Sequence, residues 1–406
     1  MTTRLNLIYS AVQGSYWMYF GAVLSFASVF LLGKGYSNSE IGVILAAANV
    51  LAVLIQPLLA DVADRGKRIS LIHIVGISSI GLAAGTLSLY LFPGKTLALS
   101  ILFIIIAALH TSLQPLVNSM AFYLSSSGYQ INFGIARSGG SVAYAVLCAI
   151  LGTLVTIYGI KAIPVTGSMI LVLLLVFLSI TAGLLKKAAH SKVTEPGAMV
   201  LKEKEETINL MAFVRRNKPF IIFSFGILFV FFQNSVLNTY LLQIITEIGG
   251  TSGQLGRLFS FMALLEIPGL FFFSKIRSRF SCQVLLKFSS VAFILKIFLV
   301  SIAGSVSFIY LAYLFQLISF PIFLSAAIHL VDEVMEKGEA VKGQSFVTGM
   351  ITMSTVFASL LGGIILDARG ASLLLAISTA TCVLGTIIVF FSVNRIRGSK
   401  DEAVSK

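Results

Sequence analysis

The sequence is poor in charged residues. Asp, Glu, Lys and Arg make up only 11% of the 406 residues, whereas 57% are hydrophobic, and the mean hydropathy is +0.97. Ordinary soluble domains carry about 25% charged residues, because their surfaces face water on all sides. This composition excludes a soluble globular protein and indicates a chain that lies largely in lipid.

Motifs of catalysis and nucleotide binding are absent as well. The chain has no G-x-S-x-G or H-E-x-x-H motif, no Walker phosphate-binding loop and no C-x-x-C pair. Its three cysteines, Cys148, Cys282 and Cys382, are far apart in the sequence and have no disulfide or metal-ligand spacing. We therefore expect no enzyme activity, no metal and no cofactor.

Long uncharged apolar stretches dominate the chain instead. Leu5–Gly33 and Pro219–Thr246 are each longer than the about 20 residues that cross the hydrocarbon core of a bilayer. The pattern predicts an all-α membrane protein with twelve transmembrane helices. The expected spans are residues 7–33, 41–63, 69–92, 97–122, 133–159, 163–185, 219–246, 255–274, 282–302, 305–331, 343–366 and 371–394.

One segment in the middle of the chain has the composition of a soluble linker. Residues 186–218 contain Lys, Glu, Ser, Pro and Gly, including the charged run from Lys202 to Glu206. The segment separates the spans six and six, which predicts a six-helix bundle in residues 1–185, a cytoplasmic linker, and a second six-helix bundle in residues 219–406. Transporters built from two such repeats bind substrate near the midplane of the membrane, between the halves.

Basic residues gather in alternate loops, as they do in cytoplasmic segments of membrane proteins. The chain has 29 Lys and Arg residues. If the N-terminus is cytoplasmic, 22 of them lie on the cytoplasmic side, five lie on the other side and two lie within spans. The bias predicts cytoplasmic termini in a multi-pass protein of the cell membrane. It also accounts for the net charge of +13 without a nucleic-acid partner. We expect the protein to act as a monomer.

Three charged residues, Arg137, Glu266 and Lys296, fall inside predicted spans. A charged side chain at the centre of a bilayer costs about 2.5–3.5 kcal/mol on insertion scales, so such residues usually serve a function. Charges of both signs within the spans predict a polar cavity between helices. That is the arrangement expected of a transporter of a small polar molecule.

Several segments resemble the major facilitator superfamily. Its signature is an acidic-then-basic turn between helices two and three, which latches the helices on the cytoplasmic side. In this chain the turn contains Asp64, Arg65, Lys67 and Arg68. Gln56-Pro57, before the turn, and the segment Phe133–Arg137 are similar to the lactose permease branch of sugar–proton symporters. The resemblance extends over nearly the whole chain and implies the major facilitator fold.

The resemblance also implies roles for individual residues. Arg137 matches an arginine that binds sugar hydroxyls, and a guanidinium suits this role because its planar fork makes paired hydrogen bonds. Tyr144, two helical turns further along the same face, matches a tryptophan that stacks on the sugar ring. Glu266 matches a glutamate that binds sugar and helps to couple protons, and Lys296 matches an arginine near the proton site.

Besides Tyr144 and Lys296, the chain departs from that branch at four further positions. Gln316 and Ser319 stand where the branch has a histidine and a glutamate in helix ten. Asn118 stands near the place of a helix-four glutamate, and Asn234 stands in the place of a helix-seven aspartate. We include both asparagines among the candidate substrate-binding residues. With these replacements, Glu266 remains the carboxylate that lies clearly in mid-membrane. We therefore expect Glu266 and Lys296 to couple transport to protons.

Other interpretations remain open for these residues. Arg137 lies near the start of its span, where long side chains extend to the membrane surface. Lys296 could be a structural counter-ion of Glu266, and His110 is more typical of packing than of proton transfer. A further set of rings and amides could line the cavity. These are Gln13, Tyr16 and Tyr19 on the first predicted helix, with Gln233, Asn234 and Asn238 on the seventh.

The sequence therefore predicts a secondary active transporter that works by alternating access. Its expected partners are a small-molecule substrate, a co-transported proton and the lipid bilayer. The resemblance favours import of a sugar or another small hydroxylated solute. A nucleoside:proton symporter is one alternative, and an exporter of drugs or metabolites from the same superfamily is another. A membrane sensor or enzyme is disfavoured, because the chain lacks an additional soluble domain.

Overall fold

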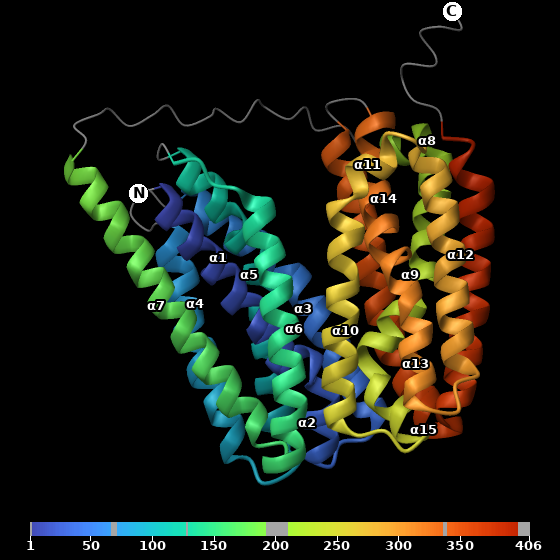
Figure 1. Cartoon of the computed structure of the whole chain (residues 1–406), viewed down its shortest axis with the longest axis horizontal. Helices are drawn as coiled ribbons and strands as arrows, with labels where there is room; N and C mark the ends of the chain where they lie inside the picture. Colours follow the sequence, from blue (N-terminus) through green and yellow to red (C-terminus); the bar gives the residue numbers. More distant parts are fainter. Residues whose placement is uncertain (1, 66–70, 127–128, 192–209, 336–338, 397–406) are drawn as a thin grey trace, which may run out of the picture. The chain divides into compact units, whose positions relative to one another are not determined.

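The computed structural model describes residues 2–65, 71–126, 129–191, 210–335 and 339–396, and nearly all of them are helical (Figure 1). Helices are the expected outcome for long apolar segments, because a backbone in lipid must satisfy its hydrogen bonds within the segment. Ten helices in the described ranges are long and apolar enough to cross a membrane. The predicted all-α membrane fold is confirmed.

The ten membrane-length helices are consistent with the twelve expected spans. Helix α15 (Ala340–Val393) contains both of the last two expected spans, which meet at Gly370, where φ is 76°. Glycine suits this position because it adopts positive φ without steric cost. Helix α10 (Ser252–Phe271) corresponds to the eighth expected span, and it lies outside the ten. Arg257 and Glu266 lower its hydropathy.

The chain divides into two compact units. Unit 1 comprises Met1–Val200 and Thr251–Leu264, and unit 2 comprises Leu201–Gly250 and Leu265–Lys406, so α10 contributes to both. Helix α7 continues to Ser191 and α8 begins at Leu210. Both ends of the segment predicted as a linker are therefore helical in the described residues.

In unit 1, α1 packs against α6 and α7, α3 packs against α5, and α4 packs against α7. The first expected span is not a single regular helix, because a π-helical turn (η1) separates α1 from α2. Turns of this kind are often found at functional sites. The elements are α1 (Thr2–Tyr19), η1 (Phe20–Ser25), α2 (Ala27–Gly33), α3 (Asn38–Arg65), α4 (Leu71–Ser88), η2 (Leu89–Leu91), α5 (Leu97–Ser126), α6 (Phe133–Tyr158) and α7 (Ala162–Ser191).

In unit 2, α9 packs along α15 and is largely buried. The two helices approach closely at Gly385, where an added Cβ would lie 2.6 Å from the Val230 nitrogen and 2.8 Å from the Gly226 oxygen. The other elements pack around this pair. The elements are α8 (Leu210–Arg216), α9 (Lys218–Thr246), α11 (Phe273–Arg277), α12 (Cys282–Ser301), α13 (Val306–Tyr313), η3 (Leu314–Leu317), α14 (Phe320–Val334) and α15 (Ala340–Val393), with the end of α10.

The tenth expected span is broken in its middle. Helix α13 gives way to the short 3-10 turn η3, and α14 begins only at Phe320. Pro321 stands in the first turn of α14. Ser319, the residue just before this helix, has a non-helical φ of −89° and ψ of −81°. Proline lacks the backbone N–H that would otherwise donate to the Leu317 oxygen, so the helical hydrogen bonding is interrupted at this point. The interruption places Gln316 on a 3-10 turn.

Candidate functional site

In unit 1, the Arg137 side chain lies on the ring of Trp17. The guanidinium carbon is 3.9 Å from the ring centroid, and Nη1 donates a hydrogen bond to Ser141 Oγ at 3.2 Å. Gly140 makes this contact possible, since an added Cβ would lie 2.7 Å from Trp17 Cδ1. A cation–π contact contributes about 0.5–2 kcal/mol, depending on its exposure. The half-buried Arg137 therefore packs on α1.

In unit 1, a hydrogen-bonded network joins α1 to α5 and includes Asn118. Gln13 Nε2 donates to the hydroxyl of Tyr9 at 2.8 Å and to Asn118 Oδ1 at 3.2 Å. The Tyr9 hydroxyl donates to the backbone oxygens of Val117 and Asn118 at 3.2 and 3.3 Å. Gln13 is fully buried. The amide network fixes the position of Asn118 relative to α1.

Tyr144, the other sequence-predicted residue on α6, contacts the π-helical turn. Its hydroxyl lies 3.0 Å from Ser25 Oγ, and an added Cβ on Gly21 would lie 3.0 Å from its ring. Its exposed fraction is 8%. Tyr144 is thus packed on η1, while Trp17 is the ring that contacts Arg137.

His110 on α5 is enclosed by aromatic rings of α1. It stacks on Tyr16 with a centroid separation of 4.3 Å, and Tyr19 lies 4.8 Å away. Within the described ranges, three buried polar atoms near this cluster have no hydrogen-bond partner: Gln13 Oε1, Trp17 Nε1 and His110 Nε2. Buried polar groups are normally paired, so these three side chains offer one acceptor, one donor and one ring nitrogen to a polar ligand.

In unit 2, four side chains form a continuous hydrogen-bonded chain. Gln316 Nε2 donates to Glu266 Oε1 at 2.8 Å, and Lys296 Nζ donates to Gln316 Oε1 at 2.8 Å. Lys296 also donates to Asn234 Oδ1 at 3.2 Å. The residues come from α9, α10, α12 and η3. The amide of Gln316 therefore links the carboxylate of Glu266 to the ammonium of Lys296.

Gly269 explains how α10 comes close enough to η3 for this arrangement. An added Cβ on Gly269 would lie 2.7 Å from the Leu317 oxygen and 2.5 Å from Pro321 Cγ. A larger residue would push α10 away from the broken helix. Because Glu266 precedes Gly269 by one helical turn, the close approach brings its carboxylate to Gln316.

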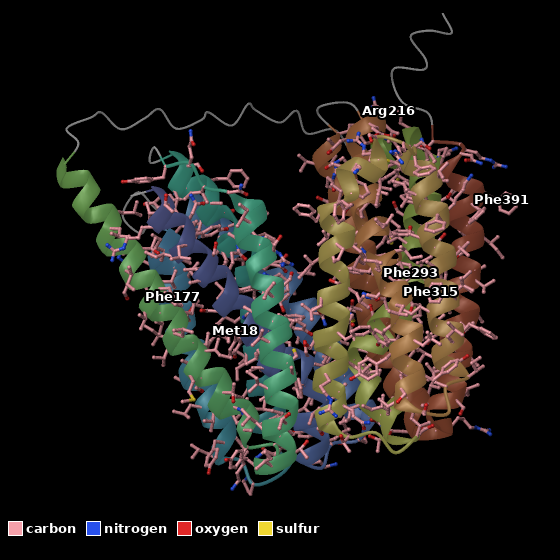
Figure 2. All side chains as sticks on the ribbon, in the orientation of Figure 1. Met18, Phe177, Arg216, Phe293, Phe315 and Phe391 are labelled. Atoms are coloured by element: carbon pink, nitrogen blue, oxygen red, sulfur yellow. The ribbon has the colours of Figure 1, made fainter. Side chains whose placement is uncertain are left out.

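Lys296 is enclosed, with an exposed fraction of 1%. Its Nζ lies 4.9 Å from the ring centroid of Phe293, which Figure 2 labels, and 5.9 Å from that of Tyr313. Burying an ammonium in an apolar environment is expensive unless it is hydrogen-bonded and balanced by an opposite charge. Two amide oxygens, two aromatic faces and the Glu266 carboxylate beyond Gln316 provide that balance.

The predicted cytoplasmic gate falls at the edge of what the structure describes. Helix α3 is described as far as Arg65. The side chains of Asp64 and Arg65, and the whole of Lys67 and Arg68, lie outside the described residues. The assignment of these four residues to a gate stays a prediction.

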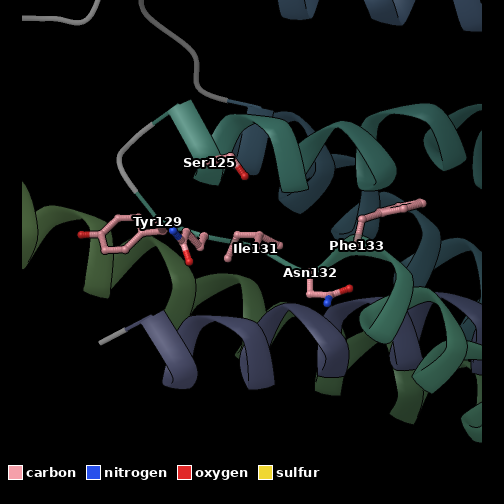
Figure 3. Close-up of a pocket in the computed structure, with 6 residues that line it drawn as sticks. Ser125, Tyr129, Ile131, Asn132 and Phe133 are labelled. Carbon is pink, nitrogen blue, oxygen red and sulfur yellow. The ribbon is translucent and has the colours of Figure 1, made fainter.

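A cavity of about 790 Å³ lies beside the connection from α5 to α6 (Figure 3). It is lined by Ser125 and residues 129–133, none of which is a candidate site residue. The connection is tied to α1, since Asn6 Nδ2 donates to the Gln130 oxygen at 2.7 Å and Asn6 Oδ1 accepts from the Asn132 nitrogen at 2.8 Å. In the described ranges, no group of His, Cys, Asp and Glu side chains could hold a metal.

Two features of the clusters were missed in the sequence. Trp17 is the only tryptophan and lies one helical turn after Gln13, a signal that could have placed it beside Arg137. The sequence indicates at Gln316 only the loss of a proton-carrying histidine, whereas in the structure its amide joins Glu266 to Lys296. Arg137, Tyr144 and Asn118 lie in unit 1, and Glu266, Lys296 and Asn234 lie in unit 2.

Comparison with known proteins gives a consistent picture. The model of the MFS_1 like family matches residues 9–377. A maltose permease of Geobacillus stearothermophilus is 24% identical over 270 residues, which are 66% of this chain and 64% of the permease. The chain thus matches less than two thirds of that relative's length.

Solved structures share the fold. A mutant form of the nucleoside transporter NupG has a TM-score of 0.78 with 14% identity, and the match covers 97% of this chain and 100% of NupG. The POT family transporter PepTSo has a TM-score of 0.74 with 10% identity, covering 97% and 98%. A bacterial homologue of the human lysosomal transporter Spinster has a TM-score of 0.63 with 14% identity, covering 97% of each chain. At these identities the likeness concerns the fold.

Proposed function

The chain belongs to the MFS_1 like family and is a secondary transporter of the major facilitator type, and we propose that it imports a sugar or another small hydroxylated solute together with protons. The observation that carries the proposal is the stack of Arg137 on Trp17 in unit 1. A guanidinium fixed on the ring of the half-buried Trp17 suits a molecule with hydroxyl groups and apolar ring faces.

Several features of unit 1 support a polar, uncharged substrate. Arg137 provides charge-assisted donors, and the unpaired atoms of Gln13, Trp17 and His110 in the described structure provide an acceptor, a donor and a ring nitrogen. A hydroxyl can both donate and accept, so it can pair with any of them. A strongly apolar ligand would leave these groups buried and unpaired, at a cost of about 1–3 kcal/mol each.

The cluster in unit 2 supports proton coupling. Glu266 is half-buried, whereas Lys296 and Gln316 are almost fully buried. In the proposed cycle Glu266 takes up a proton on one side of the membrane and releases it on the other. When Glu266 is ionised, its charge is balanced through Gln316 by Lys296. When Glu266 is protonated, Lys296 keeps the amide oxygens of Gln316 and Asn234 as partners.

A nucleoside is the nearest alternative substrate. The face of Trp17 would stack on a base as readily as on a sugar, and NupG shares the fold. A maltose permease is among the proteins that this chain resembles in sequence, which favours a sugar for this chain. Export of a lipophilic drug is less compatible with the polar atoms around Arg137. A panel of ligands separates these three possibilities.

The substrate class is tested by ligand binding to the purified protein. Trp17 is the only tryptophan, so intrinsic tryptophan fluorescence reports on the ring beneath Arg137. We expect maltose to change this fluorescence and to raise the unfolding temperature, because a ligand stabilises the state that binds it by mass action. Uridine and the lipophilic cation tetraphenylphosphonium serve as comparisons, and mannitol at equal osmolarity serves as the control.

A response to uridine alone would replace the sugar with a nucleoside. A response to tetraphenylphosphonium alone would contradict import of a hydroxylated solute. If maltose raises the unfolding temperature but leaves the tryptophan fluorescence unchanged, Trp17 and Arg137 do not belong to the binding site.

The setting in the cell follows from the distribution of charge. We propose that the protein lies in the cell membrane as a monomer with both termini in the cytoplasm, since 22 basic residues fall on that side and five on the other. In this orientation the segment with Asp64, Arg65, Lys67 and Arg68 belongs to the cytoplasmic side. We assign them to a gate there.

A further inference from the structure

A groove on the side of unit 2 is separate from the polar cluster. It has a volume of about 450 Å³ and lies between α12 and the last turns of α15. Its lining is mainly apolar, with a lysine and an asparagine at one end. The lining residues are Lys287, Val291, Thr386, Ile387, Phe390, Phe391 and Asn394.

Among the described residues, the two partners of Lys287 carry no charge. Its Nζ donates to Asn394 Oδ1 at 2.7 Å and lies 5.6 Å from the ring centroid of Phe390, and both partners are uncharged. None of the described residues that line the groove is acidic. Arg395, adjacent to Asn394, is exposed and adds a second positive charge at this end. The end of the groove therefore suits an anion.

The rest of the groove suits a hydrocarbon chain. Phe391 is 69% exposed and projects outward from α15 (Figure 2), and the side chains of Val291, Ile387 and Phe390 are also exposed. In a transmembrane helix, apolar side chains of this kind face lipid. The charged end coincides with the start of α12 and the end of α15, which the basic-residue bias assigns to the cytoplasmic surface. Headgroup and acyl chain would thus occupy the groove in the order that a phospholipid presents them.

We propose that this groove binds one anionic glycerophospholipid, with its phosphate at Lys287 and an acyl chain along Val291, Ile387 and Phe390. Basic pockets between transmembrane helices on the cytoplasmic side bind anionic headgroups in this manner. Asn394 orients the ammonium, and the Phe390 ring restricts its movement. This site lies outside the proposed transport machinery, so it does not depend on the substrate.

Native mass spectrometry of the full-length protein, with phosphatidylglycerol or phosphatidylcholine added at equal concentration, tests the proposal. We expect one phosphatidylglycerol molecule to bind more tightly than phosphatidylcholine. Lys287→Gln should weaken phosphatidylglycerol binding about fivefold, as expected for one basic residue at an anionic membrane surface. Ile387→Trp, which fills the groove and leaves the charge in place, should also displace the lipid.

Lys275→Gln is the matched control, because Lys275 is an exposed lysine of α11 that does not line the groove. It should retain the binding of the unmodified protein. An equal loss in Lys275→Gln would attribute the affinity to overall positive charge and overturn the proposal. Equal binding of phosphatidylcholine and phosphatidylglycerol would overturn it as well, as would unchanged binding in both Lys287→Gln and Ile387→Trp.

Discussion

Replacing Glu266 by Gln is expected to abolish uphill accumulation of substrate while leaving exchange between equilibrated pools partly intact. The amide keeps the size of the side chain and can still hydrogen-bond to Gln316, which now lies 2.8 Å from Glu266 Oε1. It cannot take up or release a proton. The variant should therefore behave as a permanently neutral carrier that moves substrate only down its own gradient. Uptake of radiolabelled maltose into proteoliposomes, with and without an imposed pH gradient, measures both modes.

Glu333→Gln provides the matched control for this experiment. Glu333 is an exposed carboxylate of α14 that pairs with Arg277 at 2.7 Å, and its loss should leave accumulation largely unchanged. Surface pairs of this kind contribute about 0–1 kcal/mol. Accumulation that survives in Glu266→Gln and follows the pH gradient would contradict the assignment. Asp61 on α3 and His110 on α5 would then be the next candidates for the residue that carries the proton.

Replacing Arg137 by Lys is expected to weaken substrate binding about tenfold to 100-fold, although the charge is retained. A lysine cannot present the paired donors of a guanidinium and does not stack on Trp17 in the same way. A hydrogen bond to a charged group contributes about 1.5–3 kcal/mol, which corresponds to this loss in affinity. Calorimetric titration with maltose measures the change in affinity. This method does not rely on tryptophan fluorescence, which the substitution itself would alter.

Arg257→Lys is the appropriate comparison, because Arg257 is an exposed arginine of α10 outside the Trp17 cluster. It should bind maltose with unchanged affinity. The unfolding temperature of Arg137→Lys should stay close to that of the unmodified protein, since Arg137 is only half-buried. Unchanged affinity in Arg137→Lys would show that Arg137 makes no paired hydrogen bonds to the substrate.

The sequence predicts the helices well because the bilayer imposes a simple length requirement. An apolar run of about 20 residues must become a spanning helix, whatever it packs against. Departures from regular helix are harder to predict. Pro321 signals a break in the tenth expected span, but it does not indicate that a 3-10 turn will carry Gln316. The π-helical turn at Phe20–Ser25 has no comparable signal in the sequence.

The composition of the two polar clusters was predicted only in part. Charged residues in mid-membrane are conspicuous in the sequence because each is costly in lipid, and the sequence predicts Arg137, Glu266 and Lys296 as functional residues on that ground. Their partners depend on how closely helices approach. Gly140 admits the Trp17 ring and Gly269 admits η3, and these contacts become evident only when helices distant in sequence are seen together.

Symport requires that substrate and protons move together in the same direction, and a pH electrode tests this most directly. Maltose is added to a weakly buffered suspension of de-energised cells that contain the protein, and external pH is recorded. Symport predicts an immediate rise in external pH, because protons enter with the sugar, and no rise in cells that contain Glu266→Gln. Maltose entry without a pH change in cells with the unmodified protein, or entry that depends on sodium, would contradict the account.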